Sequence, residues 1–130
     1  MSWTTNKKYR INITVDLQPG VYVFQNESGV GKSYLAKWLN RLYFHNEGVN
    51  SISGSVASKL ETLNEVVPLN CKLFMLDDYD LYNGKFEAEI DNLRKSAIIL
   101  VDCKMLPGFN FDWEYCYISF RDKDVIYVGR

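Results

Sequence analysis

Residues 26–33 read Asn-Glu-Ser-Gly-Val-Gly-Lys-Ser, and this combination of glycines, lysine and hydroxyl is suited to holding a phosphate group. The segment matches the pattern G-x-x-x-x-G-K-[ST] except at its first position, where Asn26 replaces glycine. Several backbone N–H groups must point into one cavity to bind phosphate, and Gly29 and Gly31 permit the dihedral angles that this requires. Because asparagine tolerates left-handed angles better than most residues, we expect the loop to form.

The last two residues of the loop carry the charge and a metal ligand. Lys32 would place its ammonium between the β- and γ-phosphates, and the Ser33 hydroxyl is a natural ligand for Mg²⁺. A helix that begins here would direct its positive N-terminus at the same phosphates. The residues that we predict to bind the nucleotide are Asn26, Glu27, Ser28, Gly29, Val30, Gly31, Lys32, Ser33 and Tyr34.

Three acidic residues follow apolar runs farther along the chain. Asp77 and Asp78 follow the run 72–76, and Asp102 follows the run 97–101. Together with a phosphate loop, Asp77 is predicted to hold Mg²⁺ through water, and Asp78 to polarise an attacking water as a general base. Asp102 is predicted either to position water near the γ-phosphate or to be an ordinary turn residue at the surface.

Strands and helices must position these groups. Residues Arg10–Asp16 alternate between apolar and polar, and Val21–Phe24 are apolar throughout, with the turn signal Pro19-Gly20 between them. This pattern predicts an antiparallel hairpin at the N-terminus that leads directly into the phosphate loop.

The remaining pattern predicts an α/β fold. Helices are expected from about Lys32 to His45, over Ser55–Asn64 and over Gly84–Lys95. Buried parallel strands are expected over 72–76 and 97–101, and a closing antiparallel hairpin over 113–120 and 125–128. The predicted fold is a single domain, residues 1–130, with three layers around a mostly parallel central sheet and an antiparallel hairpin at each end.

Composition narrows the possible partners. The chain has 130 residues, of which 47% are hydrophobic, so it can form a packed core. A net charge of −1 gives no general attraction to nucleic acid or anionic lipid, and no apolar stretch is long enough to cross a membrane. Three widely spaced cysteines, Cys71, Cys103 and Cys116, are expected to be buried thiols of a cytoplasmic protein.

With these motifs in place, the chain resembles a P-loop NTPase of the branch with an added strand and a catalytic acid, and most closely the ABC-type ATPases. The resemblance covers roughly residues 10–104. It rests on the predicted hairpin before the phosphate loop, on Asp77 and Asp78 after their strand, and on residues 52–55, which read Ile-Ser-Gly-Ser and are similar to the start of the ABC signature L-S-G-G-Q.

The resemblance implies ATP and Mg²⁺ as ligands, with Lys32 and Asp78 in catalysis. GTP is disfavoured, because the chain has neither N-K-x-D nor D-x-x-G. Trp3 and Tyr9 are candidates for stacking on adenine. The signature lacks its second glycine and its glutamine, and Cys103 lies near the position of the switch histidine of the family.

Two functions remain open on this evidence. One is weak or partner-dependent ATP hydrolysis. The other is a nucleotide-binding module whose bound state holds a surface in the form that a protein partner or a second copy binds. A small-molecule kinase ranks last, because the chain has five arginines and none of them are clustered.

Overall fold

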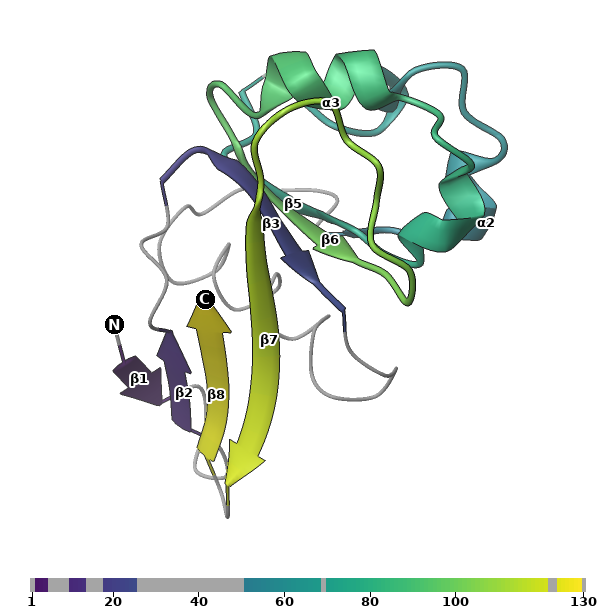
Figure 1. The fold of residues 1–130 in the computed structure, drawn as a ribbon. Helices are drawn as coiled ribbons and strands as arrows, with labels where there is room; N and C mark the ends of the chain where they lie inside the picture. Colours follow the sequence, from purple (N-terminus) through teal and green to yellow (C-terminus); the bar gives the residue numbers. More distant parts are fainter. Residues whose placement is uncertain are drawn as a thin grey trace.

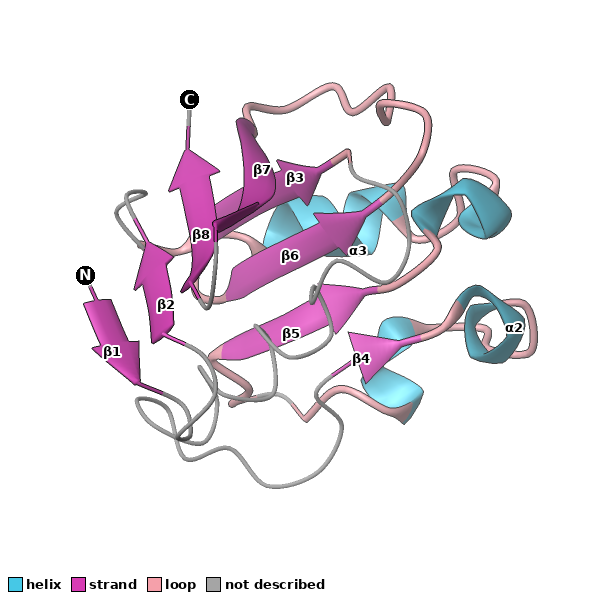
Figure 2. Ribbon diagram, turned by 90° about the horizontal axis from the view of Figure 1, so that it is seen from below, coloured by secondary structure: helices cyan, strands magenta, loops and turns pink. Residues whose placement is uncertain are grey.

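The chain contains β1 (Ser2–Thr4), β2 (Arg10–Ile13), β3 (Gly20–Phe24), β4 (Ser51–Ile52), β5 (Leu73–Leu76), β6 (Ile98–Asp102), β7 (Glu114–Arg121) and β8 (Asp124–Gly129). These strands form one sheet in the order β1-β2-β8-β7-β3-β6-β5-β4. A computed structural model describes residues 2–4, 10–13, 18–25, 51–68, 70–121 and 124–129. Figure 1 shows the sheet from one side, and Figure 2 shows its strands side by side.

Five neighbouring strands, β7, β3, β6, β5 and β4, all run parallel. Three of them, β3, β5 and β6, consist almost entirely of apolar residues and are buried along nearly their whole length. Continuous apolar strands are typical of parallel sheets, which are covered on both faces. The α/β class predicted from the sequence is therefore confirmed.

Strand β7 joins the parallel strands to the rest of the sheet. Its first residues, Glu114–Cys116, lie beside β3, and its longer second part pairs antiparallel with β8. Strand β8 runs parallel to β2, which in turn pairs antiparallel with β1. Figure 1 shows β7 as a long strand that extends from the parallel strands to the β1, β2 and β8 group.

Short helices complete the described part of the fold. They are α2 (Gly54–Ala57), the 3-10 helix η2 (Leu63–Glu65), the 3-10 helix η3 (Tyr79–Tyr82) and α3 (Glu87–Leu93). Figure 2 shows α3 against one face of the sheet, behind β6. Its residue Ile90 is fully buried in the same core cluster as Phe74 of β5 and Ile99 of β6.

The predicted N-terminal hairpin between 10–16 and 21–24 is wrong. Strand β3 pairs with β6 and β7, whereas β2 pairs with β1 and β8. Gly20 is already the first residue of β3, and its N–H donates to the Ala97 carbonyl at 3.0 Å. Pro19 and Gly20 therefore lie at the start of the central strand. A local turn signal does not determine which distant strands pair with the strand that follows it.

The predicted helix over 55–64 is also wrong, because α2 ends at Ala57. The Glu65 carboxylate accepts the backbone N–H groups of Glu61 and Thr62 at 2.6 and 2.8 Å. A carboxylate that captures backbone donors in this way replaces helical hydrogen bonds and starts a new turn, which here is η2. The apolar spacing was correct in part, since Leu60 and Leu63 are buried, but Val56 is 43% exposed.

The third predicted helix, Gly84–Lys95, is present as the shorter α3. Asn83, Gly84 and Phe86 all have positive φ angles, so the helical conformation cannot begin before Glu87. The helix predicted over 32–45 lies outside the described residues. Among the described helices, none combines the length and the apolar character needed to cross a bilayer.

We predict that Gly54→Ala destabilises the protein, because α2 lies against η3 at this glycine. An added Cβ would lie 2.6 Å from Leu81 Cβ and 3.2 Å from the Asp78 carbonyl oxygen. The backbone would have to shift, at a cost of about 1–3 kcal/mol in the free energy of unfolding. Urea unfolding measures this, with Gly108→Ala as the control, since that Cβ would meet nothing within 4 Å. Equal stability of the two variants would contradict the packing described here.

Candidate functional site

Three parallel strands end together at one edge of the sheet. Phe24 of β3 lies opposite Asp102 of β6, and Leu76 of β5 lies opposite Val101. Asp77 follows Leu76 and therefore lies beside Asp102, which follows Val101. The predicted phosphate loop begins two residues after Phe24. The carboxyl edge of a parallel sheet is where open α/β folds bind their ligands.

Asp77, Asp78 and Asp102 form an acidic cluster at this edge. One carboxylate oxygen from each residue lies within 4.8 Å of the others. Asp102 is buried, Asp77 is half-buried and Asp78 is exposed. The cluster thus runs from the sheet interior to solvent. Asp102 is a buried residue at the end of β6, so the alternative of an ordinary turn residue at the surface is wrong.

The backbone around Asp77 is held by the neighbouring strand. Its N–H donates to the carbonyl of Ile52, the last residue of β4, at 2.9 Å. The hydroxyl of Tyr82 donates to the same carbonyl at 2.5 Å. The Asp78 N–H donates to Asp77 Oδ1 at 3.1 Å. These contacts hold the end of β5 in place and leave the carboxylate facing its acidic neighbours.

Asp78 turns the chain out of the sheet. Its backbone is left-handed, with φ 53° and ψ 49°, a conformation in which aspartate is enriched among non-glycine residues. Helix η3 starts immediately afterwards, and the Leu81 N–H donates to the Asp78 carbonyl at 2.9 Å. The change of direction keeps Asp78 at the edge of the sheet beside Asp77.

Crowding of these acids changes the ionisation of Asp77. Burial, followed by the hydrogen bond and negative charge of Asp102 and the charge of Asp78, raises the pKa of Asp77 to about 7. The N–H of Asp78 works in the opposite direction, but its effect is smaller. Asp77 can therefore hold a proton near neutral pH, and a cation at this position would favour the ionised form.

Asp80 links the two loops that carry the acids. Its carboxylate oxygens accept the backbone N–H groups of Lys104 and Met105 at 2.8 and 2.9 Å. Burial opposes the ionisation of this carboxyl, but these two N–H groups, the N–H of Asp80 itself and the charge of Lys104 together lower the pKa of Asp80. The segment after Asp78 is thereby tied to the segment after Asp102.

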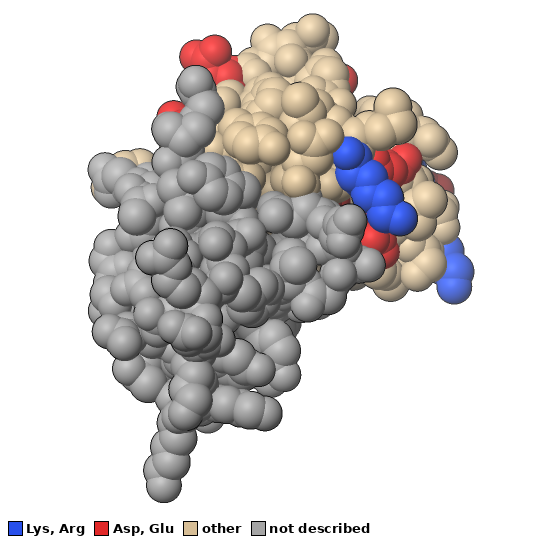
Figure 3. Space-filling model, turned by 60° about the horizontal axis from the view of Figure 1, so that its bottom comes forward, with Lys and Arg blue, Asp and Glu red and all other residues tan. Residues whose placement is uncertain are grey.

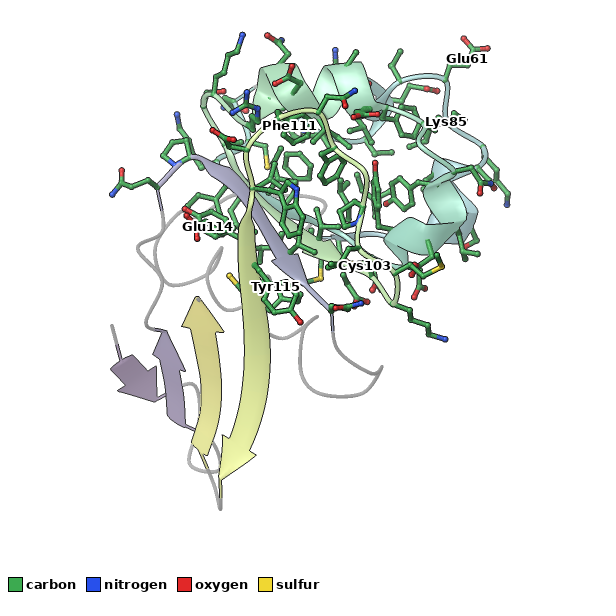
Figure 4. All side chains as sticks on the ribbon, in the orientation of Figure 1. Glu61, Lys85, Cys103, Phe111, Glu114 and Tyr115 are labelled. Atoms are coloured by element: carbon green, nitrogen blue, oxygen red, sulfur yellow. The ribbon has the colours of Figure 1, made fainter. Side chains whose placement is uncertain are left out.

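Gln25 forms a second link, from the end of β3. Its side-chain Nε2 donates to the Lys104 carbonyl at 2.9 Å, and its Oε1 accepts the Tyr115 hydroxyl at 3.3 Å. Figure 4 shows Tyr115 and Cys103 at this end of the sheet. The chain therefore leaves β3 next to the loop that follows Asp102.

The sequence motifs identified only part of this site. Asp77, Asp78 and Asp102 were named from the ends of apolar runs, but Gln25, Asp80 and Tyr82 were missed. The sequence shows Asp80 as a third acidic residue within four positions. An aspartate side chain alone, however, does not indicate that it will accept hydrogen bonds from two backbone N–H groups. The residues from Asn26 to Tyr34 and Tyr9 lie outside the described part, as does the side chain of Trp3.

A scan against protein-family models, a search of curated proteins and a search of solved structures each found no match to this chain. Its function is therefore inferred from its own residues and their geometry.

We predict that the Asp77 carboxyl makes wild-type stability fall as pH rises from about 4 to about 7. In this window the folded state holds a proton that the unfolded state, with its ordinary pKa, has lost. Asp77→Asn removes this effect. Without divalent cations, the free energy of unfolding of the variant minus that of wild type should therefore be about 1–2 kcal/mol larger at pH 8 than at pH 5. This figure is well below the full shift because solvent screens a half-buried carboxyl.

Thermal unfolding at both pH values, in the presence of a chelator, measures the difference. The exposed Asp112→Asn is the matched control and should show no such change. A gap between wild type and Asp77→Asn that does not vary with pH would show that the acids do not crowd one another.

We also predict that Asp80→Ala loosens the link between the two acid-bearing loops. Loss of two charge-assisted hydrogen bonds should lower the free energy of unfolding by about 1–3 kcal/mol. Hydrogen exchange should speed up at the amides of Lys104 and Met105. Asp91→Ala, which breaks a partly exposed ion pair with Arg94, is the control and should leave both amides unchanged. Unchanged exchange in Asp80→Ala would refute the link.

Proposed function

We propose that this chain binds ATP with Mg²⁺ at the carboxyl edge of its parallel strands, with residues 26–33 as the phosphate loop. One observation carries the proposal. Strand β3, buried at the centre of the sheet, ends two residues before the phosphate-binding sequence and beside Asp102. A glycine-rich loop after such a strand meets the structural context that the motif requires on its N-terminal side.

The strand order supports the same proposal. The next described strand after β3 is β4 at the far edge, whereas the chain after β6 continues to β7 on the other side of β3. Neighbouring strands whose connections leave in opposite directions mark the usual ligand crevice of an open sheet. In addition, β6 lies between β3 and the acidic strand β5, as expected for P-loop proteins with an added strand.

The finer description of the fold belongs to this proposal. We infer a three-layer P-loop arrangement in which the helix predicted from Lys32 to His45 covers the second face of the sheet. The antiparallel pair β7 and β8 would close this arrangement beyond the P-loop strand.

The acidic cluster fits a hard divalent cation. Its donors are carboxylate oxygens, which Mg²⁺ prefers. Burial and the neighbouring acids raise the pKa of Asp77, and a bound cation would favour its ionised form. Asp77 and the hydroxyl of Ser33 would hold the ion. Once bound, Mg²⁺ would neutralise charge on the phosphates.

Lys32 and Asp78 are the proposed catalytic residues. Lys32 would stabilise charge on the transferred phosphoryl group, and Asp78 would accept a proton from the attacking water. Asp78 is exposed next to Asp77, so water can reach it. Aspartate is one methylene shorter than the glutamate usual at this position, which favours slow or partner-dependent hydrolysis.

The alternative is a module that binds ATP without hydrolysing it, and Cys103 favours this alternative. In the ABC-type ATPases that the sequence resembles, the switch histidine would fall near this position. Here Cys103 is 2% exposed, and its N–H donates to the Phe24 carbonyl at 3.2 Å. A buried thiol cannot replace the imidazole as a hydrogen-bond donor to phosphate.

We predict that calorimetry detects ATP binding in the presence of Mg²⁺, and that Lys32→Ala weakens it about 10-fold or more, as expected for a lost charge-assisted contact. Lys59→Ala changes an exposed lysine elsewhere and serves as the control. No binding by wild type, or equal effects of the two variants, would refute the proposal.

Phosphate release from the same samples separates the two functions. Turnover that is lost in Asp78→Asn supports hydrolysis with Asp78 as base. Tight binding without turnover supports the module. Turnover that is unchanged in Asp78→Asn removes Asp78 from the catalytic residues.

A further inference from the structure

A groove lies beside the acidic cluster, between η3 and the segment that follows β6. We call it the η3 groove; its volume is about 350 Å³. Figure 1 shows the segment between β6 and β7 passing beside η3 and then over α3. The groove is lined by Tyr79, Asp80, Asn83, Gly84, Glu87, Met105, Leu106, Pro107, Gly108 and Phe109.

The charge of the η3 groove is negative. Asp80 and Glu87 line it, and no lysine or arginine does. Among the described residues neither carboxylate forms an ion pair, although the charge of Lys104 contributes to lowering the pKa of Asp80. Glu87 Oε1 accepts the backbone N–H of Asn110 at 3.1 Å. Both carboxylates are thus held in place by backbone N–H groups, and no lysine or arginine of the lining neutralises them.

Figure 3 shows a lysine or arginine side chain next to acidic ones on one face of the described part. The lining of the groove itself contains Asp80 and Glu87 and no basic residue.

Large apolar side chains border the same groove. Met105 is 77% exposed and Leu106 is 49% exposed, and both belong to the lining. Leu81 on η3 is 59% exposed. Among the described residues, these are three of the four large hydrophobic side chains that are exposed, so their position near one acidic groove is distinctive.

An aromatic base gives the groove a rigid floor. The rings of Tyr79 and Phe109 lie 5.2 Å apart, and Phe109 stacks on Phe111 at 4.6 Å. Arg94 lies over the Phe111 ring, 4.9 Å from its centroid, in a cation–π contact. A floor of this kind offers contact to an apolar or a guanidinium group.

We propose that the η3 groove binds a segment of a partner protein in which arginine or lysine alternates with large apolar residues. The carboxylates complement the cations, and Met105 and Leu106 complement the apolar side chains. Arginine fits best, because its planar group can pair with a carboxylate and stack on an aromatic ring. Nucleic acid and anionic lipid are disfavoured by the sign of the charge. The small size of the groove indicates a weak, transient interface.

The proposal stands without nucleotide, although the groove adjoins the proposed nucleotide site. Helix η3 starts after Asp78, and Asp80 ties it to the segment after Asp102. A bound segment would therefore lie next to the acidic cluster. The test uses no ATP, so its failure leaves the nucleotide proposal untouched.

The test is a titration monitored by NMR of methionine methyl groups in the full chain. The probe is a blocked hexapeptide of alternating arginine and leucine. We expect saturable shifts of the Met105 methyl signal, with no shift for Met75, which is fully buried in β5. The matched peptide with glutamate in place of arginine should bind about 10-fold more weakly or not at all.

Variants then assign the site. Glu87→Gln keeps an acceptor for the Asn110 N–H and should weaken peptide binding about 5- to 20-fold. Leu106→Ser removes an exposed apolar contact and should weaken it about 3- to 10-fold. Glu61→Gln is the matched control, because Figure 4 shows Glu61 pointing outward, away from Phe111 and Cys103. The affinity of this variant for the peptide should equal that of wild type.

Several results would overturn the proposal. These are no shift at Met105, equal affinity for the two peptides, or unchanged affinity in Glu87→Gln. Arginine amide that binds as tightly as the peptide would assign the groove to a small cationic ligand. Met105 shifts that follow protein concentration without peptide would assign it to a second copy of the chain.

Discussion

Strand β6 pairs in parallel with β3 on one side and β5 on the other, and the register of these two ladders sets the level at which all three strands end. Because Phe24 lies opposite Asp102 and Leu76 opposite Val101, the polar residues that follow the apolar runs meet at one edge. A shift of one residue in either ladder would reverse the faces of the apolar side chains and also separate the acids. The packing of the core and the geometry of the candidate site therefore depend on the same pairing.

This pairing carries an electrostatic cost. Three carboxylates share a small space, and Asp77 responds by holding a proton near neutral pH. Backbone donors keep the cluster in place: Asp80 spans the two loops, and Gln25 ties the end of β3 to one of them. Carboxylates at the carboxyl edge of a parallel sheet, where β3 leads into the residues of a predicted phosphate loop, are the basis of our proposal that the chain binds a metal-bound triphosphate.

The sequence predicted the buried strands and the acidic edge because the signal for both is local. Runs such as Phe74–Leu76 are apolar on both faces, and the first acid after each run marks its end. Pairing depends on distant residues, so Pro19 and Gly20 suggested a hairpin although the partner of β3 lies near Ile98. Helix lengths were overestimated for a different reason. The spacing of Leu60 and Leu63 fits a helix, but the Glu65 carboxylate captures two backbone N–H groups that a continuous helix needs. Apolar periodicity contains no information about such competition.

The central claim is that the phosphate loop and the acidic edge form a single site. The most direct measurement is paramagnetic broadening of backbone amide signals by Mn²⁺ in the presence of ATP, compared between wild type and Lys32→Ala. The account predicts that the signals of residues 77–79 and 102–104 disappear in wild type at low Mn²⁺, and that they persist in Lys32→Ala at the same concentrations. Broadening of these signals that is equal in the two proteins, or that occurs only at other acidic residues such as Asp112, would contradict it.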